Sequence, residues 1–382
     1  MAESTARALL TPQIWDDKFF TEYVRDNRFR RYMGTSPSNV IQVKEDLSRR
    51  PGDRVTFATA RALSGGVTGN TVLEGNEAEL DLRSLTVGVR PLRNAVVVTE
   101  WDEQKSAIDI REAARPGLKM WSQEQMREDT INALKSVPNA SGVMVTYEAA
   151  TAAERNVWLT NNADRVLFGS AIANGSSNVM ATALATVDST NDKLTASVVS
   201  LAKRRAQMAS PRIMPTRTRE EDEEWFVMFA NPLSFRDLSQ DPVMVQANRD
   251  ARVRGVDTNP LFTGGSLVWD GVIIREIPEM GLPIAATPGG RMAQTGGILA
   301  GVGTAGINVG FNFLCGAQAL GAAWAQRLKS TTDVRDYGFR HGVGVQEIRG
   351  IEKLMFGTGA DDRTTLVQNG VVTVFTSAVS DA

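Results

Sequence analysis

The stretch QKSAIDIREAARPGLKMWSQEQMREDTINALKS, residues 104–136, decides how the fold is interpreted. Apolar side chains recur through it among Glu, Gln, Lys and Arg, a composition typical of a helix. At about 1.5 Å per residue such a helix spans about 50 Å, which is very long for a globular domain. Pro116 predicts a kink, or the start of a second helix, at that position. We expect this segment to act as a spine.

An extended hairpin with a glycine-rich, polar end precedes the spine. Side chains over residues 54–60 alternate with the period of a strand. Residues 64–77 form the polar end of the hairpin, and residues 85–98 form its second strand. Because a two-stranded ribbon is only marginally stable alone in water, we expect it to pack across a neighbouring subunit. The predicted inter-subunit contact residues of the hairpin are Val55, Phe57, Leu63, Val67, Leu85 and Val87.

The N-terminal segment carries an aromatic helical face. Trp15, Phe19 and Tyr23 are spaced i, i+4 and i+8, so they share one side of a helix that starts near Pro12. That face needs a partner, which is either the core of the same subunit or a neighbouring subunit. We include the three residues among the predicted inter-subunit contacts and leave both alternatives open.

The remaining sequence mixes helices and strands. Helices are expected over residues 192–209, with Asp192 as the cap, and over residues 241–252. Strands are expected at residues 225–229 and 370–375, and Asp270-Gly271 predicts a hairpin turn. Because no regular βαβ alternation is visible, we predict an α+β class with an antiparallel emphasis.

Composition excludes several function classes. The chain has 382 residues with 42 Lys plus Arg against 44 Asp plus Glu, so its formal net charge of −2 disfavours dedicated DNA binding. One cysteine, Cys315, and one histidine, His341, exclude an intrachain disulfide, a cysteine-based zinc site and a two-histidine metal site. We predict no catalytic residue, no cofactor and no metal. Neither a signal peptide nor a membrane-spanning segment is expected.

Gly301–Gly306 matches the G-x-G-x-x-G pattern of dinucleotide-binding turns. That pattern requires a helix opening at the motif and an acidic residue about 20 positions later. Residues 307–311 look instead like a strand, and no Asp or Glu occurs between Glu279 and Asp333. We interpret these glycines as permitting close packing, and keep a nucleotide-binding enzyme as a second alternative.

The order of elements resembles the major capsid proteins of tailed bacteriophages with the Hong Kong 97 type fold, in the branch related to the capsid protein of phage N-four. The stretches that carry the resemblance are TPQIWDDKFF from Thr11, VIQVKEDL from Val40, GDRVTF from Gly52, LRNAVVV from Leu92, EQKSAID from Glu103, GAQALG from Gly316 and GVVTV from Gly370.

This resemblance implies a domain plan. Residues 1–36 would form the N-arm, 37–100 the E-loop hairpin, 101–137 the spine helix of the peripheral domain, 138–350 the axial domain with peripheral-domain strands, and 351–382 the C-terminal strands. Some relatives join subunits through an E-loop lysine. Lys44 is the only lysine between Ser36 and Arg90 and lies at the hairpin base, so no such crosslink is expected.

The resemblance also implies a function. The chain would be a non-enzymatic shell protein, made in the host cytoplasm, that assembles into hexamers and pentamers of an icosahedral head enclosing double-stranded DNA. It would touch the packaged DNA only weakly and would work with separate scaffolding, portal and decoration proteins. The first alternative is the shell protein of an encapsulin-like nanocompartment.

Overall fold

The computed structural model describes residues 27–48, 52–60, 66–70, 72–77, 82–105, 110–218, 224–252, 266–283, 296–357, 362 and 364–379. The predicted contact residues Trp15, Phe19, Tyr23 and Leu63 lie outside these ranges. The chain divides into two compact units. Unit 1 includes Arg90–Met126 and Gln326–Ile348, and unit 2 comprises Arg28–Val89, Arg127–Ala325 and Arg349–Ala382.

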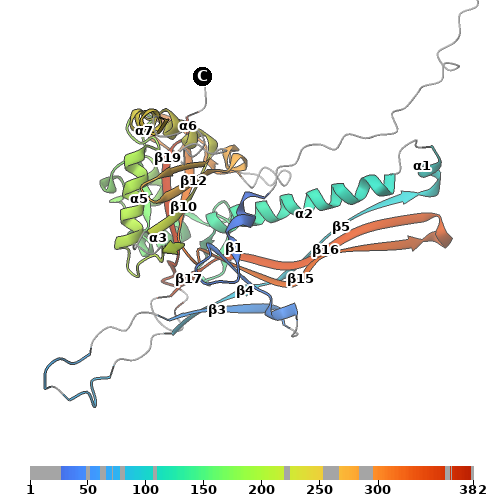
Figure 1. The fold of residues 1–382 in the computed structure, drawn as a ribbon, viewed down its shortest axis with the longest axis horizontal. Coiled ribbons are helices and arrows are strands. Elements are labelled where there is room, and N and C mark those ends of the chain that lie inside the picture. The colour runs from blue at the N-terminus through green and yellow to red at the C-terminus, as the bar shows by residue number, and fades with distance from the viewer. Residues whose placement is uncertain are drawn as a thin grey trace, which may run out of the picture. The chain divides into compact units, whose positions relative to one another are not determined.

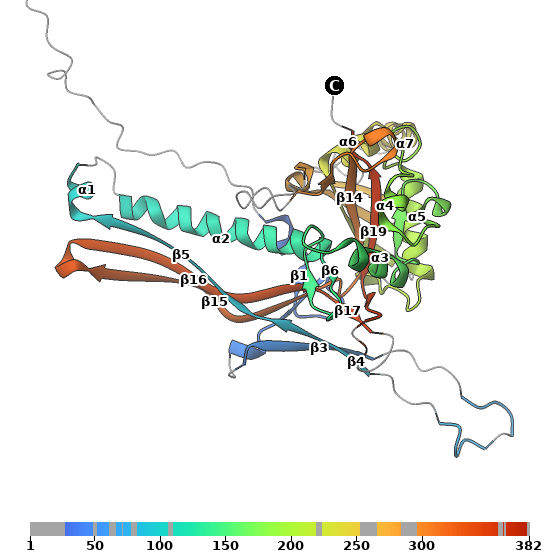
Figure 2. The ribbon, with the colours of Figure 1, turned by 180° about the vertical axis from the view of Figure 1, so that it is seen from behind.

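A mixed β-sheet forms the centre of unit 2 (Figures 1 and 2). Its path is β11-β12-β10-β14-β19-β8, with β9 paired to β10 and β13 paired to β14. β14 is antiparallel to β10 and β19, whereas β10 is parallel to β12 and β19 is parallel to β8. The predicted α+β class is confirmed. The strands are β8 (Val166–Phe168), β9 (Arg217–Thr218), β10 (Glu224–Ala230), β11 (Ser266–Trp269), β12 (Val272–Glu276), β13 (Ile298–Leu299), β14 (Val309–Cys315) and β19 (Val371–Ser377).

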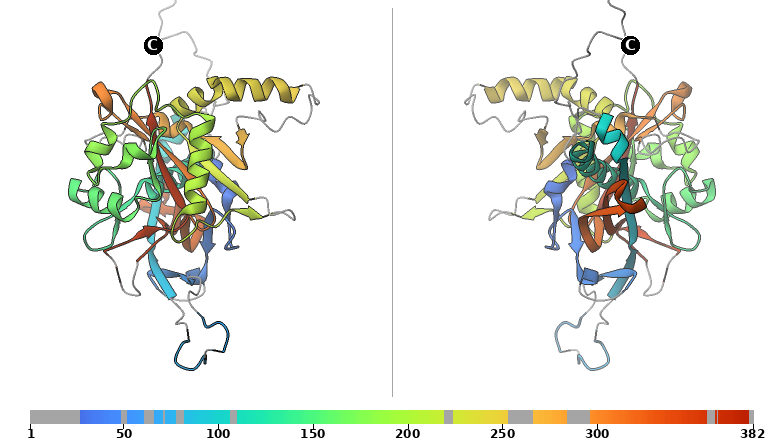
Figure 3. Two further views of the ribbon diagram at one scale, coloured as in Figure 1. Left: turned by 90° about the vertical axis from the view of Figure 1, so that its left-hand side faces the viewer. Right: turned by 90° about the vertical axis from the view of Figure 1, so that its right-hand side faces the viewer.

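Both faces of this sheet are buried, which explains the continuous apolar run of β10. Phe226 and Met228 belong to a cluster that α5 also enters, and Figure 3 shows α5, in lime green, beside the dark red β19. Phe229 points to the opposite face, since side chains alternate along a strand. The helices of unit 2 are α3 (Ala152–Asn161), α4 (Met180–Leu184), α5 (Ala196–Met208), α6 (Pro232–Gln240) and α7 (Pro242–Arg252).

The end of the predicted N-arm packs on this sheet. Phe29 and Tyr32 contact the ring of Phe229 edge to face, with centroids 4.8 and 5.5 Å away. Arg275 Nε donates a hydrogen bond of 3.0 Å to the Tyr32 hydroxyl. The part of the arm that the structure describes therefore belongs to the chain's own core.

The Asp270-Gly271 turn forms as predicted. It joins the antiparallel pair β11 and β12, and both turn residues have positive φ, 47° and 71°. A two-residue turn with both φ angles positive matches the twist of the strands that it joins.

The predicted capping of the helix over residues 192–209 is wrong. α5 begins at Ala196, and the carboxylate of Asp241 accepts a hydrogen bond of 2.7 Å from the Ala196 amide. Asp192 instead accepts hydrogen bonds from the Ser170 amide and from Asn174 Nδ2. The cap is supplied by a residue distant in sequence, which local patterns do not reveal.

Unit 1 contains β5 (Arg90–Thr99), α1 (Glu100–Lys105) and parts of α2 (Ile110–Lys135), β15 (Leu320–Arg335) and β16 (Arg340–Lys353). The long predicted helix is present, but α2 starts at Ile110 and continues through Pro116 without interruption. Val343 and Val345 of β16 form an apolar cluster with Leu118 and Trp121 of α2. We attribute the continuity of α2 to this packing, which outweighs the hydrogen bond that proline cannot donate.

The base of the hairpin lies on the chain's own core. β3 (Arg54–Ala60) pairs antiparallel with β4 (Leu82–Gly88), and Val55 lies opposite Val87 in this pair. Val55, Phe57 and Val87 are 4%, 1% and 0% exposed, and they cluster with Leu354 and Phe356. These three side chains were predicted to contact a neighbouring subunit, but burial in unit 2 leaves them almost no surface for it.

Several short strands complete the described chain: β1 (Met33–Gly34), β2 (Ile41–Lys44), β6 (Val137–Pro138), β7 (Met144–Val145), β17 (Met355–Phe356) and β18 (Val367–Gln368). Lys44, at the end of β2, donates a hydrogen bond of 2.9 Å from Nζ to the Thr56 carbonyl and lies 4.7 Å from the ring centroid of Phe57. It is therefore at the hairpin base, as expected from the sequence.

A lysine is buried where β16 ends. Lys353 is 1% exposed, and its Nζ donates a hydrogen bond of 2.9 Å to the Ser136 carbonyl and lies 5.6 Å from the ring centroid of Trp158. No carboxylate of the described residues forms an ion pair with it. Burial lowers the pKa of the Lys353 amine to about 7, and the neighbouring Cys315 thiol acts in the opposite direction.

We predict that Phe57→Ala lowers the free energy of unfolding of the isolated subunit by about 3–5 kcal/mol, because it removes a fully buried ring. Thr56→Ala, on the exposed face of the same strand, is the matched control and should change stability by less than about 0.5 kcal/mol. Chemical denaturation at several protein concentrations provides the measurement. A loss that appears only when subunits associate would contradict burial within the chain.

We predict that Lys353→Met removes part of the pH dependence of stability. The folded pKa of about 7 lies below the ordinary value of 10.5, so between these values the unfolded chain binds more protons. The free energy of unfolding of the parent therefore rises with pH across this window. The difference in free energy of unfolding, variant minus parent, should be most positive at pH 7 and below. Lys329→Met, at an exposed position of β15, should retain the parent's slope in denaturation measured from pH 6 to 10. Equal slopes for the parent and Lys353→Met would refute the assignment.

Candidate functional site

The far end of the hairpin exposes apolar side chains. Asn76 closes a turn there through a hydrogen bond of 2.9 Å from its amide to the Leu73 carbonyl, and Gly75 has φ of 83°. Val72 and Leu73 are 66% and 56% exposed, whereas the predicted contact residue Val67 is half-buried. Adjacent apolar side chains that stay more than half exposed in the described chain are typical of an interaction surface.

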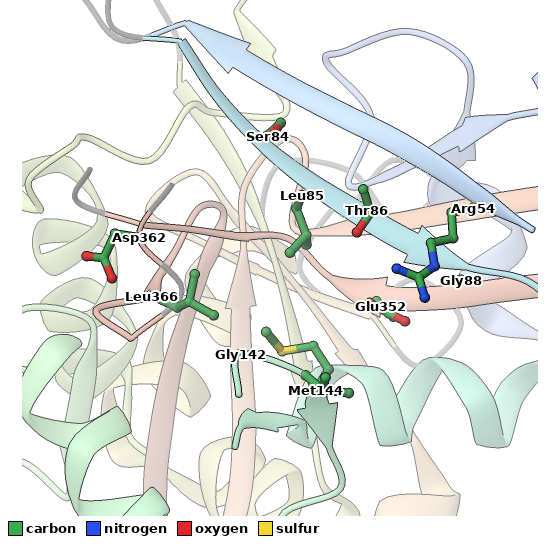
Figure 4. A pocket seen from close by; sticks show the side chains of 11 residues that line it. Arg54, Ser84, Leu85, Thr86, Gly88, Gly142, Met144, Glu352, Asp362 and Leu366 are labelled. Carbon is green, nitrogen blue, oxygen red and sulfur yellow. The ribbon is translucent and has the colours of Figure 1, made fainter. Parts of the chain in front are cut away.

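A pocket of about 250 Å³ lies beside the hairpin base in unit 2 (Figure 4). The half-buried Leu85, another predicted contact residue, lines it together with Met144 and Leu366. Two carboxylates, Glu352 and Asp362, also reach its wall. The pocket thus has a mixed lining, in which Arg54, Ser84 and Thr86 add further polar groups beside the apolar side chains.

Asp362 is engaged in its own turn and is not available as a ligand. Its carboxylate accepts hydrogen bonds from the Thr365 hydroxyl and from the Thr364 amide, the latter at 2.8 Å. These bonds, led by that of the Thr365 hydroxyl, hold the pKa of Asp362 well below its usual range. Among the described residues, no group of His, Cys, Asp and Glu side chains is arranged to hold a metal ion.

Gly301–Gly306 does not form a dinucleotide-binding turn. A three-residue 3-10 turn, Thr304–Gly306, is followed by β14, so no helix opens at the motif. The Gly301 amide donates to the side-chain oxygen of Asn308 at 3.1 Å, and both Gly301 and Gly306 have positive φ. The glycines serve the turn into β14, as the sequence interpretation preferred.

His341 has a carboxylate neighbour in unit 1. Its Nε2 lies 3.8 Å from Glu100 Oε1, a separation suited to a weak ion pair when the imidazole is protonated.

Among the described helices, none combines the length and the apolar character that crossing a bilayer requires.

Unit 1 presents aromatic residues that the sequence analysis did not single out. Tyr337, in the turn between β15 and β16, is fully exposed, and Trp101 and Phe339 are 59% and 44% exposed. The signal in the sequence was Asp336 and Gly338 on either side of Tyr337, since Asp and Gly are residue types that favour turns.

Comparison with known proteins identifies the family. The model of the family described as "Phage capsid protein" matches residues 8–380. The major capsid protein of Pseudomonas phage KPP25 is 26% identical over 374 residues, which cover 96% of this chain and 94% of that protein.

Solved structures agree with this match. The capsid of cyanophage Pam1 is 34% identical and covers 100% of both chains with a TM-score of 0.86. The capsid of Ralstonia phage GP4, 21% identical over 100% of both chains, shares the fold with a TM-score of 0.71. The predicted phage-capsid fold is confirmed, and the chain belongs to the phage capsid protein family.

Proposed function

We propose that this chain is a major capsid protein whose copies assemble into the hexamers and pentamers of an icosahedral phage head that encloses double-stranded DNA. The observation that carries the proposal is the hairpin, whose base is fixed in the chain's own core while Val72 and Leu73 at its end are exposed. The similarity to the KPP25 major capsid protein along nearly the whole of both chains supports the same function. It also favours a phage head over a nanocompartment shell.

The proposed inter-subunit surface comprises the hairpin end and the aromatic face of the N-arm. Val67 is half-buried and belongs to the hairpin end. Leu85 belongs to the hairpin base, where it packs against the cluster around Phe57, and it is proposed as a contact only through the part of its side chain that stays exposed. Trp15, Phe19, Tyr23 and Leu63 are proposed as further contacts on the strength of their sequence pattern. Assembly is then driven by covering apolar surface, which is stabilising in proportion to the area removed from water.

The protein acts as a structural component of the virion and has no catalytic role. The formal net charge of −2 lets many copies pack without strong mutual repulsion and keeps contact with the packaged DNA weak. Synthesis in the host cytoplasm and cooperation with separate scaffolding, portal and decoration proteins complete the proposal.

We predict that deletion of residues 64–77 leaves a folded, soluble subunit that forms no shells. The cluster around Phe57 remains in this variant, so circular dichroism and the unfolding midpoint should match those of the parent. Negative-stain microscopy and sedimentation measure assembly.

A milder variant separates loss of contact from loss of fold. Val72→Ser combined with Leu73→Ser keeps the chain length and should lower the yield of shells at least tenfold. Thr68→Ser, at an exposed position of the same hairpin, should assemble like the parent. Shells of normal size and yield from both the deletion and the double variant would refute the role of the hairpin end.

A further inference from the structure

A short helical turn of unit 2 presents a group of arginines to solvent. The 3-10 turn Arg28–Tyr32 has the sequence RFRRY, and all three of its arginines are exposed. A 3-10 helix has three residues per turn, so side chains three positions apart lie on the same face. Phe29 and Tyr32 therefore share one face, and the arginines occupy the other two. We call this segment the RFRRY turn.

The aromatic face fixes the RFRRY turn to the sheet of unit 2. Phe29 is 1% exposed and, like Tyr32, packs edge to face on the ring of Phe229 in β10. The Tyr32 hydroxyl also accepts the hydrogen bond from Arg275 Nε. Because the sheet holds one face of the turn, the arginines on the other faces project into solvent from a fixed backbone.

The three arginines keep their charge uncompensated within the described subunit. Arg28 donates a hydrogen bond to the carbonyl oxygen of Glu276, which orients the guanidinium without neutralising it. Arg30 and Arg31 form no hydrogen bond or ion pair with any described residue. By contrast, the buried Arg349 of the same unit pairs with a carboxylate at 2.9 Å.

Grouping these charges opposes formation of the turn. Arg28 and Arg31 share a face at positions i and i+3, and like charges at that spacing on a helix repel each other. A bound anion would offset this repulsion. Guanidinium groups bind phosphate in a planar, two-pronged geometry, so a fixed group of them without carboxylate partners is typical of a phosphate-binding surface.

The proposed function supplies an anion of this kind. Double-stranded DNA carries one phosphate charge per about 1.7 Å of helix length, so three neighbouring guanidinium groups can each reach a phosphate. The net charge of −2 does not prevent such a contact, because salt limits the reach of a charge to about 8 Å at physiological ionic strength. Contacts to phosphates alone carry no sequence information, which suits a protein that must accept any DNA.

We infer that the RFRRY turn binds the phosphate backbone of the DNA enclosed by the shell, through Arg28, Arg30 and Arg31. The inference rests on the proposed function and deepens it, because it assigns the weak contact with packaged DNA to three residues. It requires the RFRRY turn to face the enclosed DNA.

The salt dependence of DNA binding tests this assignment. The probe is a short, fluorescently labelled DNA duplex of random sequence, and fluorescence anisotropy measures its affinity for dispersed subunits. The logarithm of the affinity falls by about 0.9 per neutralised phosphate for each unit in the logarithm of salt concentration. Three contacts therefore predict a loss of affinity of about fortyfold between about 50 and 200 mM salt.

Arg30→Gln combined with Arg31→Gln removes the two arginines that have no partner in the described chain. One phosphate contact then remains, so the loss of affinity over the same salt range should shrink to about fourfold. At about 50 mM salt the variant should bind the duplex at least about tenfold more weakly than the parent.

The matched control is Arg204→Gln combined with Arg212→Gln. It removes the same charge from two exposed positions of unit 2, one in α5 and one after it, and should keep the parent's salt dependence. The unfolding midpoints of both double variants should match that of the parent. An equal change of salt dependence in both would attribute binding to net charge and overturn the role of the RFRRY turn.

An acidic protein is the competing ligand. Polyglutamate with about as many charges as the duplex is the second probe, and the parent should bind it more weakly than the duplex. Tighter binding of polyglutamate that depends on Arg30 and Arg31 would overturn the assignment to DNA. The same conclusion would follow if Arg30→Gln with Arg31→Gln abolished shells and left DNA binding unchanged.

The failure of this inference and the failure of the proposed function are distinguishable. A parent chain that forms no shells refutes the proposed function, whatever its affinity for DNA. Parent shells together with an unchanged salt dependence in Arg30→Gln with Arg31→Gln overturn the assignment of the RFRRY turn and leave the shell function in place.

Discussion

The apolar contact between Phe57 and the segment around Leu354 determines which part of the hairpin is available to other molecules. Strand alternation puts Val55 and Phe57 on one face of β3, and the C-terminal part of the chain covers that face. The base of the hairpin is then fixed by folding alone. Beyond it, Val72 and Leu73 are 66% and 56% exposed in the described chain, and assembly as proposed would cover them.

Because of this division, the contacts that stabilise the folded subunit are stronger than the individual contacts that join subunits. Burial of a Val or Leu side chain contributes about 1.5–3 kcal/mol, and ordering and association subtract from it. One pair of exposed side chains therefore gives only a weak contact, whereas the core beneath the hairpin is already complete in the single subunit. A closed shell gains its stability from the number of such contacts, and weak individual contacts allow misplaced subunits to leave.

Features set by neighbouring residues could be predicted from the sequence, and features set by distant residues could not. Asp270-Gly271 fixes its own turn, and the apolar run at residues 225–229 marks a strand buried on both faces. Asp192 looked like a helix cap because it precedes α5, yet Asp241 supplies that hydrogen bond from another part of the chain.

The same limit applies to the candidate surface. Val55, Phe57 and Val87 have the pattern of a ribbon with one apolar face, and that pattern does not say whether this chain or another covers the face. The covering residues Leu354 and Phe356 lie far along the sequence, and nothing local pairs them with β3. Tyr337 was missed for the opposite reason: an aromatic residue is ordinarily expected inside, and its exposure follows from the backbone angles of one turn.

Long cationic side chains hold together the parts of unit 2 where strands are shortest. β6, β7, β17 and β18 have two residues each, so their ladders can pair only a few backbone groups. Arg165 donates to the carbonyls of Gln368 and Pro211, Lys135 to that of Gly296 and Lys353 to that of Ser136.

Burying these charged groups costs free energy. Burial lowers the pKa of both Lys135 and Lys353, which means that the interior disfavours their charged form. Replacement by apolar side chains would avoid that cost but leave the carbonyls without donors. Fixed loops make a preorganised surface, and preorganisation reduces the entropy lost when subunits meet. For a chain that must fit copies of itself repeatedly, this rigidity gives a physical reason to retain charged groups in its interior.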